Sequence, residues 1–152
     1  MSQFIESRPG VKAEFIRVLT RRFTQFSAVG LSGFLLDSAL YGLLVGPLAV
    51  PHSLARAISY WIAATSNWFW NRQFAFGDAV KRRMLGQWSQ YMTLSLVSFV
   101  PSFGTYYVLT HMVPFFIDHK YPALVLGVGA GVLFNFVGAS MLVFRLYGWL
   151  KD

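Results

Sequence analysis

The sequence predicts an all-α integral membrane protein with four transmembrane helices, arranged as two similar two-helix hairpins. Two observations carry this prediction. Apolar residues make up 55% of the 152 residues and charged residues only 12%, whereas a soluble domain typically carries about 25% charged residues. The charges also fall in short patches between long apolar runs, such as the uncharged stretch from Met84 to Ile117. A soluble protein of buried helices is the alternative, but soluble helices rarely repeat this pattern four times.

Each apolar run is long enough to cross a bilayer, whose core needs about 20 predominantly apolar residues in a helix. We expect spanning helices near 24–46, 54–76, 88–113 and 121–144. Gly46, Pro47 and Pro51 mark the end of the first helix. Pro101 lies inside the third helix and lacks a backbone N–H, which predicts a kink there.

Lysine and arginine predict the orientation of these helices. Of the 13 basic residues, only Arg56 and Lys120 fall in the first and third connections, and the rest lie in the two terminal segments and the second connection. Basic residues are retained on the cytoplasmic side, so both termini are expected in the cytoplasm. The domain limits follow as a cytoplasmic segment 1–22, a membrane domain 23–146 and a cytoplasmic tail 147–152. Basic residues that only flank spans also argue against a nucleic-acid-binding surface.

The N-terminal segment has its own helical pattern. Val11, Phe15, Val18 and Leu19 recur at helical spacing, with basic residues between them. This pattern predicts a short amphipathic helix that lies on the cytoplasmic membrane surface. A disordered arm is the alternative.

The two halves of the chain repeat each other. An offset of 65 residues aligns Tyr41 with Tyr106, and an offset of 68 aligns Asn67 with Asn135 in the following helix. The second helix of each hairpin carries a ridge of small residues that recur every four positions. The ridges are Ala55, Ser59, Ala63, Asn67 and Asn71 in the first hairpin, and Ala123, Gly127, Gly131, Asn135 and Ala139 in the second. Small residues on one face allow close approach of membrane helices. We therefore expect the second and fourth helices to pack against each other through these ridges, with the asparagines forming hydrogen bonds across them.

The run from Ser66 to Phe76 (SNWFWNRQFAF) resembles the signature of the GtrA-like family. The start of the first helix, from Arg22 to Gly30 with Asp37 further on, is similar to that family's first helix. Trp68 stands where the family usually has Phe, and Phe74-Ala75 replaces its common Trp-Thr. The resemblance covers about residues 20–146.

This resemblance implies a small protein of the bacterial inner membrane that serves cell-surface polysaccharide synthesis. Family members are associated with moving polyprenyl-phosphate-linked sugars, or the polyprenyl phosphate carrier, across the membrane. The expected partners are therefore this lipid, the membrane lipids and a membrane glycosyltransferase. Because four helices make a thin wall around a bulky head group, we also expect a homo-oligomer.

Asp37 is the first candidate for the substrate site, because a charge in the bilayer core costs several kcal/mol unless it is paired or hydrated. Its expected partner is Arg56, near the outer end of the second helix. Either the two form a structural ion pair, or Arg56 binds a phosphate with its planar fork. If the pair is structural, removal of Asp37 should leave an uncompensated buried cation.

The other candidate substrate-binding residues lie along the same helices: Arg72, Asn71, Asn67, Asn135 and Tyr41. Arg72 is placed to hold a lipid phosphate from the cytoplasmic leaflet, and the family signature supports this, although a snorkelling topology signal is the alternative. The asparagines are also explained by the ridges, and Tyr41 by packing or by a cavity wall. Cysteine is absent and the three histidines lack metal-ligand spacing, so we expect neither a metal nor a cofactor.

The resemblance therefore implies a protein that flips a polyprenyl-phosphate-linked sugar or polyprenyl phosphate, and we expect that it is not an enzyme. It contains neither a nucleophile–base–orienter set nor a Gly-rich phosphate loop with its lysine. Transport is then downhill, ion-coupled or driven by removal of product. A non-transporting scaffold for a glycosyltransferase and a small cation or drug exporter are the alternatives.

Overall fold

The computed structural model describes residues 9–77, 79 and 83–144, and every regular element in this part of the chain is helical. The all-α prediction is therefore confirmed for the described residues. The chain divides into two compact units, Met1–Gly77 and Asp78–Asp152. The boundary falls between the two predicted hairpins, so each unit contains one of them.

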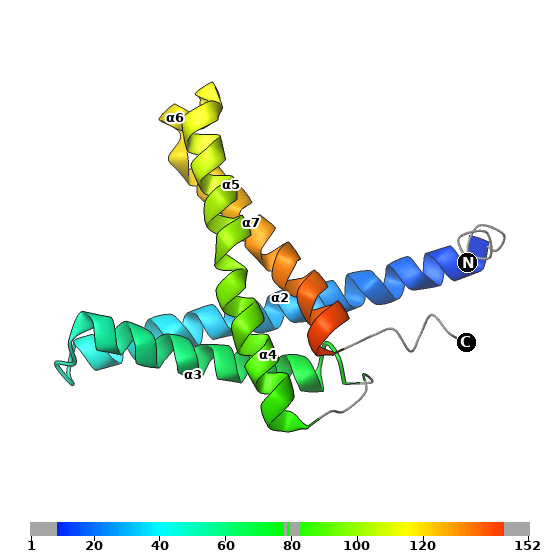
Figure 1. Ribbon diagram of the computed structural model, residues 1–152, viewed down its shortest axis with the longest axis horizontal. Coiled ribbons are helices and arrows are strands. Elements are labelled where there is room, and N and C mark those ends of the chain that lie inside the picture. The colour runs from blue at the N-terminus through cyan, green and yellow to red at the C-terminus, as the bar shows by residue number, and fades with distance from the viewer. Residues whose placement is uncertain (1–8, 78, 80–82, 145–152) are drawn as a thin grey trace. The chain divides into compact units, whose positions relative to one another are not determined.

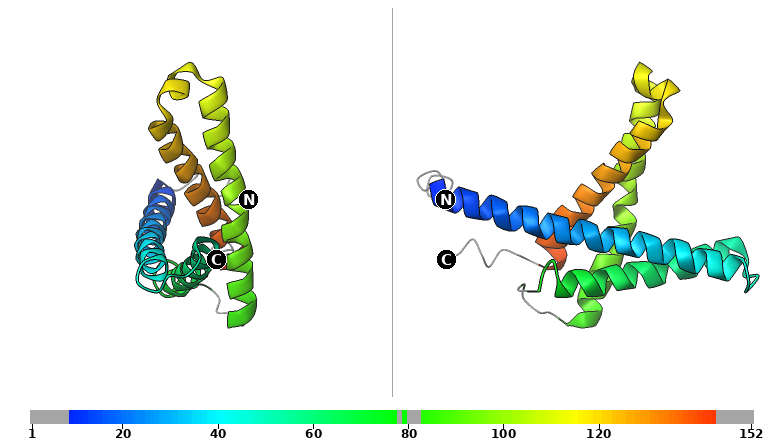
Figure 2. Two further views of the ribbon diagram at one scale, coloured as in Figure 1. Left: turned by 90° about the vertical axis from the view of Figure 1, so that its left-hand side faces the viewer. Right: turned by 180° about the vertical axis from the view of Figure 1, so that it is seen from behind.

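The first unit is a pair of antiparallel helices, α2 (Pro9–Val45) and α3 (His52–Gln73), which lie side by side in Figures 1 and 2. A tight turn joins them. Ala49 takes a left-handed backbone conformation with φ 50°, and the Val50 N–H donates to the Leu44 carbonyl at 2.8 Å. The end of the first helix is thus close to the predicted residue 46.

The N-terminal limit of the first helix differs from the prediction. α2 is continuous from Pro9 through the whole predicted span, so a separate surface helix is not confirmed for the described residues, and the domain boundary at residue 22 stays a prediction. The physical reason is that no glycine or proline interrupts residues 11–29. With 37 residues, α2 is about 55 Å long, well beyond a hydrocarbon core of about 30 Å. Residues 1–8 and the predicted tail 147–152 lie outside the described residues.

The second unit contains four helices and a final π-helical turn. They are α4 (Met84–Val97), α5 (Phe99–Met112), the short α6 (Pro114–Asp118), α7 (Lys120–Gly138) and η1 (Ala139–Val143). α5 and α7 lie side by side in antiparallel directions (Figures 1 and 2). This pair matches the second predicted hairpin.

The predicted third helix is interrupted at Ser98, which separates α4 from α5. Pro101 has no N–H to donate to the carbonyl four residues earlier, that of Val97. At the interruption, the Ser98 hydroxyl donates to the Leu94 carbonyl in the last turn of α4, at 2.8 Å. The interruption lies three residues before Pro101, so regular helix is broken close to the predicted kink, and the kink itself stays a prediction.

Both hairpins end in the same wide turn. The Phe76 N–H donates to the Asn71 carbonyl at 2.9 Å, and the Phe144 N–H donates to the Ala139 carbonyl at 2.8 Å. Each bond spans five residues, as in a π-helix, and the two sites are related by the 68-residue offset. Both phenylalanines are almost fully buried. The predicted second helix, 54–76, therefore ends in a turn after Gln73 rather than as regular α-helix.

Each small-residue ridge packs on the partner helix of its own hairpin. A Cβ added to Gly127 would lie 2.7 Å from the Ser102 carbonyl oxygen of α5, and one added to Gly131 would lie 2.9 Å from the Ser102 Cβ. In the first unit, Asn67 of the α3 ridge lies directly against Gly33 of α2. The expectation that the ridges face each other is not confirmed, because within each unit the hairpin partner occupies this helix face.

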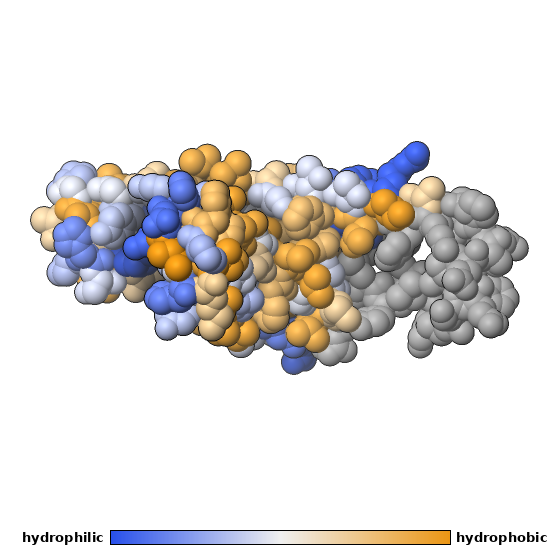
Figure 3. Space-filling model, turned by 90° about the horizontal axis from the view of Figure 1, so that it is seen from above, coloured by the Kyte–Doolittle hydropathy of each residue, from blue (hydrophilic) through white to orange (hydrophobic). Residues whose placement is uncertain are grey.

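The burial pattern is the reverse of that of a water-soluble protein. Large apolar side chains such as Phe34, Phe99 and Val125 are exposed, whereas Ala55 and Ala123 on the ridges are fully buried. Figure 3 shows apolar side chains over much of the surface in that view. Because lipid is as apolar as these side chains, they need no burial in protein. The pattern indicates a membrane protein.

Three helical segments of the described chain are long and apolar enough to cross a membrane: Ile16–Val45, Met84–Met112 and Lys120–Val143. They correspond to the first, third and fourth predicted spans. α3 is not among them, although its 22 residues are about 33 Å long. It carries polar residues at both ends, from His52 and Arg56 to Asn71 and Arg72, so the second predicted span is not confirmed.

The close contact of α7 with α5 predicts different costs for alanine at two neighbouring glycines. Gly127→Ala places a Cβ against backbone and should destabilise the protein by about 1–3 kcal/mol. Gly129→Ala meets nothing within 4 Å and should be neutral or stabilising by up to about 1 kcal/mol, because alanine favours a helix over glycine. Thermal unfolding of both variants in detergent measures the difference. Equal stability would show that α5 and α7 do not approach this closely.

Candidate functional site

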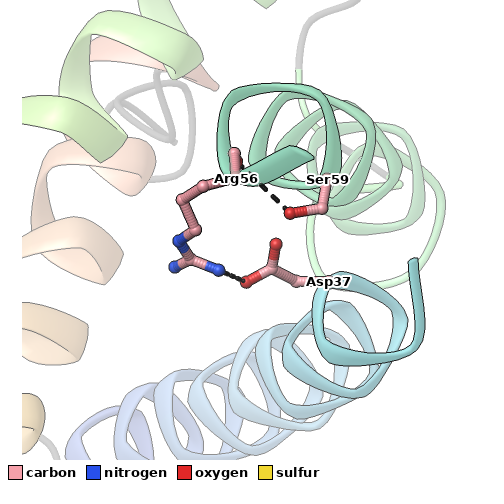
Figure 4. Close-up of polar contacts among 3 residues, drawn as sticks. All are labelled: Asp37, Arg56 and Ser59. Carbon is pink, nitrogen blue, oxygen red and sulfur yellow. Dashed lines mark hydrogen bonds and ion pairs between the residues drawn. The ribbon is translucent and has the colours of Figure 1, made fainter. Parts of the chain in front are cut away.

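An ion pair joins the two helices of the first unit near their connecting turn. The Arg56 Nη1 donates to the Asp37 Oδ2 at 2.5 Å (Figure 4). Asp37 comes from α2 and Arg56 from the second turn of α3, so the antiparallel hairpin itself brings them together. The pairing predicted from the sequence is confirmed.

The two partners of this pair are buried to very different extents. The Asp37 side chain is 11% exposed, whereas the Arg56 side chain is 59% exposed. The carboxylate therefore lies inside the hairpin and the guanidinium at its surface. Whether removal of Asp37 leaves a costly cation therefore depends on whether the exposed guanidinium faces lipid or water, and this expectation stays a prediction.

Each charged group of the pair keeps hydrogen-bonding atoms that the ion pair does not engage. The Asp37 Oδ1 is buried and has no hydrogen-bond partner among the described residues. Ser59, one turn from Arg56, donates its hydroxyl hydrogen to the Arg56 carbonyl at 3.3 Å, and in Figure 4 its side chain is directed toward Asp37. On the arginine, Nη1 binds the carboxylate, while the exposed guanidinium has four more N–H donors. The site thus offers an open cationic edge and an open acceptor.

A second polar contact lies one helical turn away. The Tyr41 hydroxyl and the His52 Nδ1 are 2.9 Å apart. Tyr41 follows Asp37 by four residues and His52 precedes Arg56 by four, so the two contacts form consecutive rungs between α2 and α3. His52 was missed as a site residue. The mirrored four-residue spacings on two antiparallel helices are the signal that would have found it.

In the second unit, the positions equivalent to Asp37 and Arg56 carry no charge, although Tyr106 stands at the position of Tyr41. The repeat offsets place Ser102 at the position of Asp37, Leu124 at that of Arg56 and Lys120 at that of His52. Ser102 packs against Gly127 and Gly131, so this position forms a close helix contact in one repeat and holds a charge in the other. A charge that one repeat carries and the other does without is not needed to build the hairpin. The charged pair is therefore a feature that distinguishes the first unit from the second.

Arg72 lies near the other end of α3. Its guanidinium carbon stands 5.8 Å from the centre of the Trp68 ring, a cation–π distance. Arg72 and Arg56 are 16 residues apart, which is about 24 Å along the helix and about 160° around it. The two arginines therefore lie near opposite ends and on different sides of α3. Asn71, beside Arg72, is fully buried.

The two repeat-related asparagines share one property. The side-chain oxygens of Asn67 and Asn135 are buried and lack a hydrogen-bond partner among the described residues. The hydrogen bonds expected to join the ridges through these oxygens are therefore not found. The Asn67 amide is instead in tight contact with the backbone at Gly33.

The unequal burial of the ion pair predicts unequal effects of removing each partner. Arg56→Met leaves a buried carboxylate unpaired and should destabilise the protein by about 1–3 kcal/mol. Asp37→Asn leaves the more exposed partner unpaired and should cost less than Arg56→Met. The double variant should recover most of the stability lost in Arg56→Met. Thermal unfolding of the four proteins forms the cycle, and a larger loss in Asp37→Asn than in Arg56→Met would contradict the observed burial.

Comparison with known proteins agrees with the sequence signature. Residues 25–144 match the family model described as "GtrA/DPMS, transmembrane domain". This range covers both hairpins and all seven candidate residues. Among curated proteins, none matches the chain. The protein therefore belongs to the GtrA/DPMS transmembrane-domain family, as the resemblance predicted.

Proposed function

We propose that the protein translocates a polyprenyl phosphate, free or linked to a sugar, across the bacterial inner membrane for cell-surface polysaccharide synthesis. Membership of the GtrA/DPMS family supports a role in polysaccharide synthesis at the membrane. The observation that carries the proposal is the exposed guanidinium of Arg56, anchored by the buried carboxylate of Asp37. The protein acts as a non-catalytic carrier.

Arg56 suits a phosphate for geometric reasons. The planar guanidinium presents paired N–H donors that match two phosphate oxygens, whereas lysine presents a single point charge. Asp37 holds one edge of the guanidinium through Nη1, which orients the opposite edge outward. The phosphate of a lipid can reach this edge while its polyprenyl tail stays in the membrane.

Arg72 is the second phosphate ligand in this proposal. The separation of about 24 Å between the two arginines approaches the thickness of the hydrocarbon core, about 30 Å. One arginine then serves the cytoplasmic leaflet and the other the outer leaflet. Because they lie on different sides of α3, the head group must pass around this helix rather than along one of its faces.

The proposal includes four spans with both termini in the cytoplasm. α3 crosses the membrane beside α2. α2 covers the small-residue ridge of α3 and carries Asp37, whose carboxylate lies between the two helices. The polar face of α3 is then shielded from lipid along much of its length. Two or more copies enclose the head group, since one hairpin covers only one side of it.

Arginine geometry, and not charge alone, should be required for transport. We expect Arg56→Lys and Arg72→Lys to keep expression and topology, and at least one to lose tenfold or more of its flipping rate, with the alanine variants no better. Arg21→Lys, an exposed arginine of α2 outside the site, is the matched control. Dithionite quenching of a fluorescent polyprenyl phosphosugar in proteoliposomes measures the rate.

Two outcomes of this experiment favour the other classes of function. Wild-type rates in Arg56→Ala, Arg72→Ala and Asp37→Asn alike would refute the arginine–phosphate mechanism and favour a scaffold for a glycosyltransferase. Loss of transport in Asp37→Asn alone, with both arginines dispensable, would favour a cation or drug exporter that depends on a membrane carboxylate.

The proposed topology can be tested in a chain that has no native cysteine. Single cysteines at Ser53 and His119 should react with an impermeant maleimide from outside the cell. Cysteines at Ser2 and Asp78 should react only after the membrane is permeabilised. Labelling of Ser53 and Asp78 from the same side would show that α3 does not cross the membrane as proposed.

A further inference from the structure

We infer that Asp37 takes up one proton when Arg56 binds the phosphate, so that the cargo is a singly charged phosphodiester and moves together with one proton. This inference rests on the proposed function and adds to it the coupling ion and the charge class of the cargo. It distinguishes between the two lipids left open above: a phosphodiester-linked sugar carries one negative charge, and a free polyprenyl phosphate carries close to two near neutral pH.

Charge balance at the site is the first argument. Asp37 and Arg56 together are neutral, so a bound phosphodiester would leave the site with one net negative charge. An uncompensated charge in a low-dielectric environment is costly. One proton on Asp37 restores neutrality and removes the repulsion between carboxylate and phosphate. A phosphate monoester with two charges would still leave one negative charge.

The position of the Asp37 Oδ1 is the second argument. This oxygen is buried and receives no hydrogen bond among the described residues, so it is the carboxylate atom that is open to a proton. Ser59 cannot donate to it while its hydroxyl hydrogen is bound to the Arg56 carbonyl. The Ser59 oxygen retains free lone pairs on the side that faces Asp37 in Figure 4. A proton on Oδ1 gives this carboxyl a donor for that acceptor.

Few other titratable groups face Asp37. α3 is the helix packed on α2 in this unit, and it contributes Arg56 and Tyr60. The Tyr60 hydroxyl interacts electrostatically with both Asp37 and Arg56. The next rung contains Tyr41 and His52, which bind each other. His52 is therefore the competing proton acceptor, and the experiment must separate it from Asp37.

Calorimetry of the purified full-length protein counts the protons directly. The probe is farnesyl methyl phosphate, a diester that does not titrate near neutral pH, injected at pH 8 in buffers with different ionisation heats. The wild type should take up about one proton per bound probe, and its Kd should rise about tenfold per pH unit between pH 7.5 and 8.5. Asp37→Asn should bind the probe with no proton uptake and a flat pH dependence. Asp37→Ser, which copies Ser102 of the other repeat, is the second variant in case the first fails to fold.

The outcomes separate this inference from the function on which it rests. Binding that requires Arg56 but takes up no proton in the wild type overturns the proton coupling and leaves the proposed function standing. Proton uptake that persists in Asp37→Asn and disappears in His52→Gln also overturns it, in favour of the histidine. Tighter binding of farnesyl phosphate than of its methyl ester at pH 8 overturns the cargo class. Absence of binding, or equal binding by Arg56→Lys and the wild type, refutes the arginine–phosphate site itself and this inference with it.

Discussion

The close approach of the two helices within each hairpin is the constraint on which the other features of the structure depend. Lipid provides little hydrophobic force between helices, so contact must come from close packing. The ridges supply it, as the fit of Gly127 and Gly131 against Ser102 shows. In the first unit, the same proximity shields a carboxylate from lipid and brings it within hydrogen-bond distance of an arginine. Without that approach, Asp37 would be an unpaired charge in the membrane.

The two hairpins use one scaffold for different purposes. At equivalent positions, the second unit has Ser102 against two glycines and the first has Asp37 between Ser59 and Arg56. A buried ion pair is weak support for stability, because desolvation offsets much of the attraction. The second unit shows that the hairpin forms without one. The pair is therefore a feature of the first hairpin alone, and the proposed phosphate site rests on its exposed cationic edge.

The repeated wide turn gives both hairpins a similar end. A bond that spans five residues leaves nearby carbonyls without their regular helical partners. In the second unit, the Gln87 side chain donates to the Val143 carbonyl at 3.3 Å and so satisfies one of them. Arg22 occupies the equivalent place in the first unit and is buried. The family signature, which ends at Phe76, thus coincides with a backbone feature that the second hairpin shares.

The sequence alone determined the helical class, the repeat, the break near Pro101 and the pairing of Asp37 with Arg56, because each follows from composition, spacing or the cost of an unpaired charge. It also located the ridges but did not identify the helix that each ridge packs against within its own hairpin. A stripe of small residues looks the same whichever helix covers it, and only the tertiary structure decided that each hairpin closes on itself. The tertiary structure likewise decided the burial of the ion pair. The residue types predicted the contact, but the exposed fraction of each side chain depends on how the two helices pack. That geometry buries the carboxylate and leaves the guanidinium exposed.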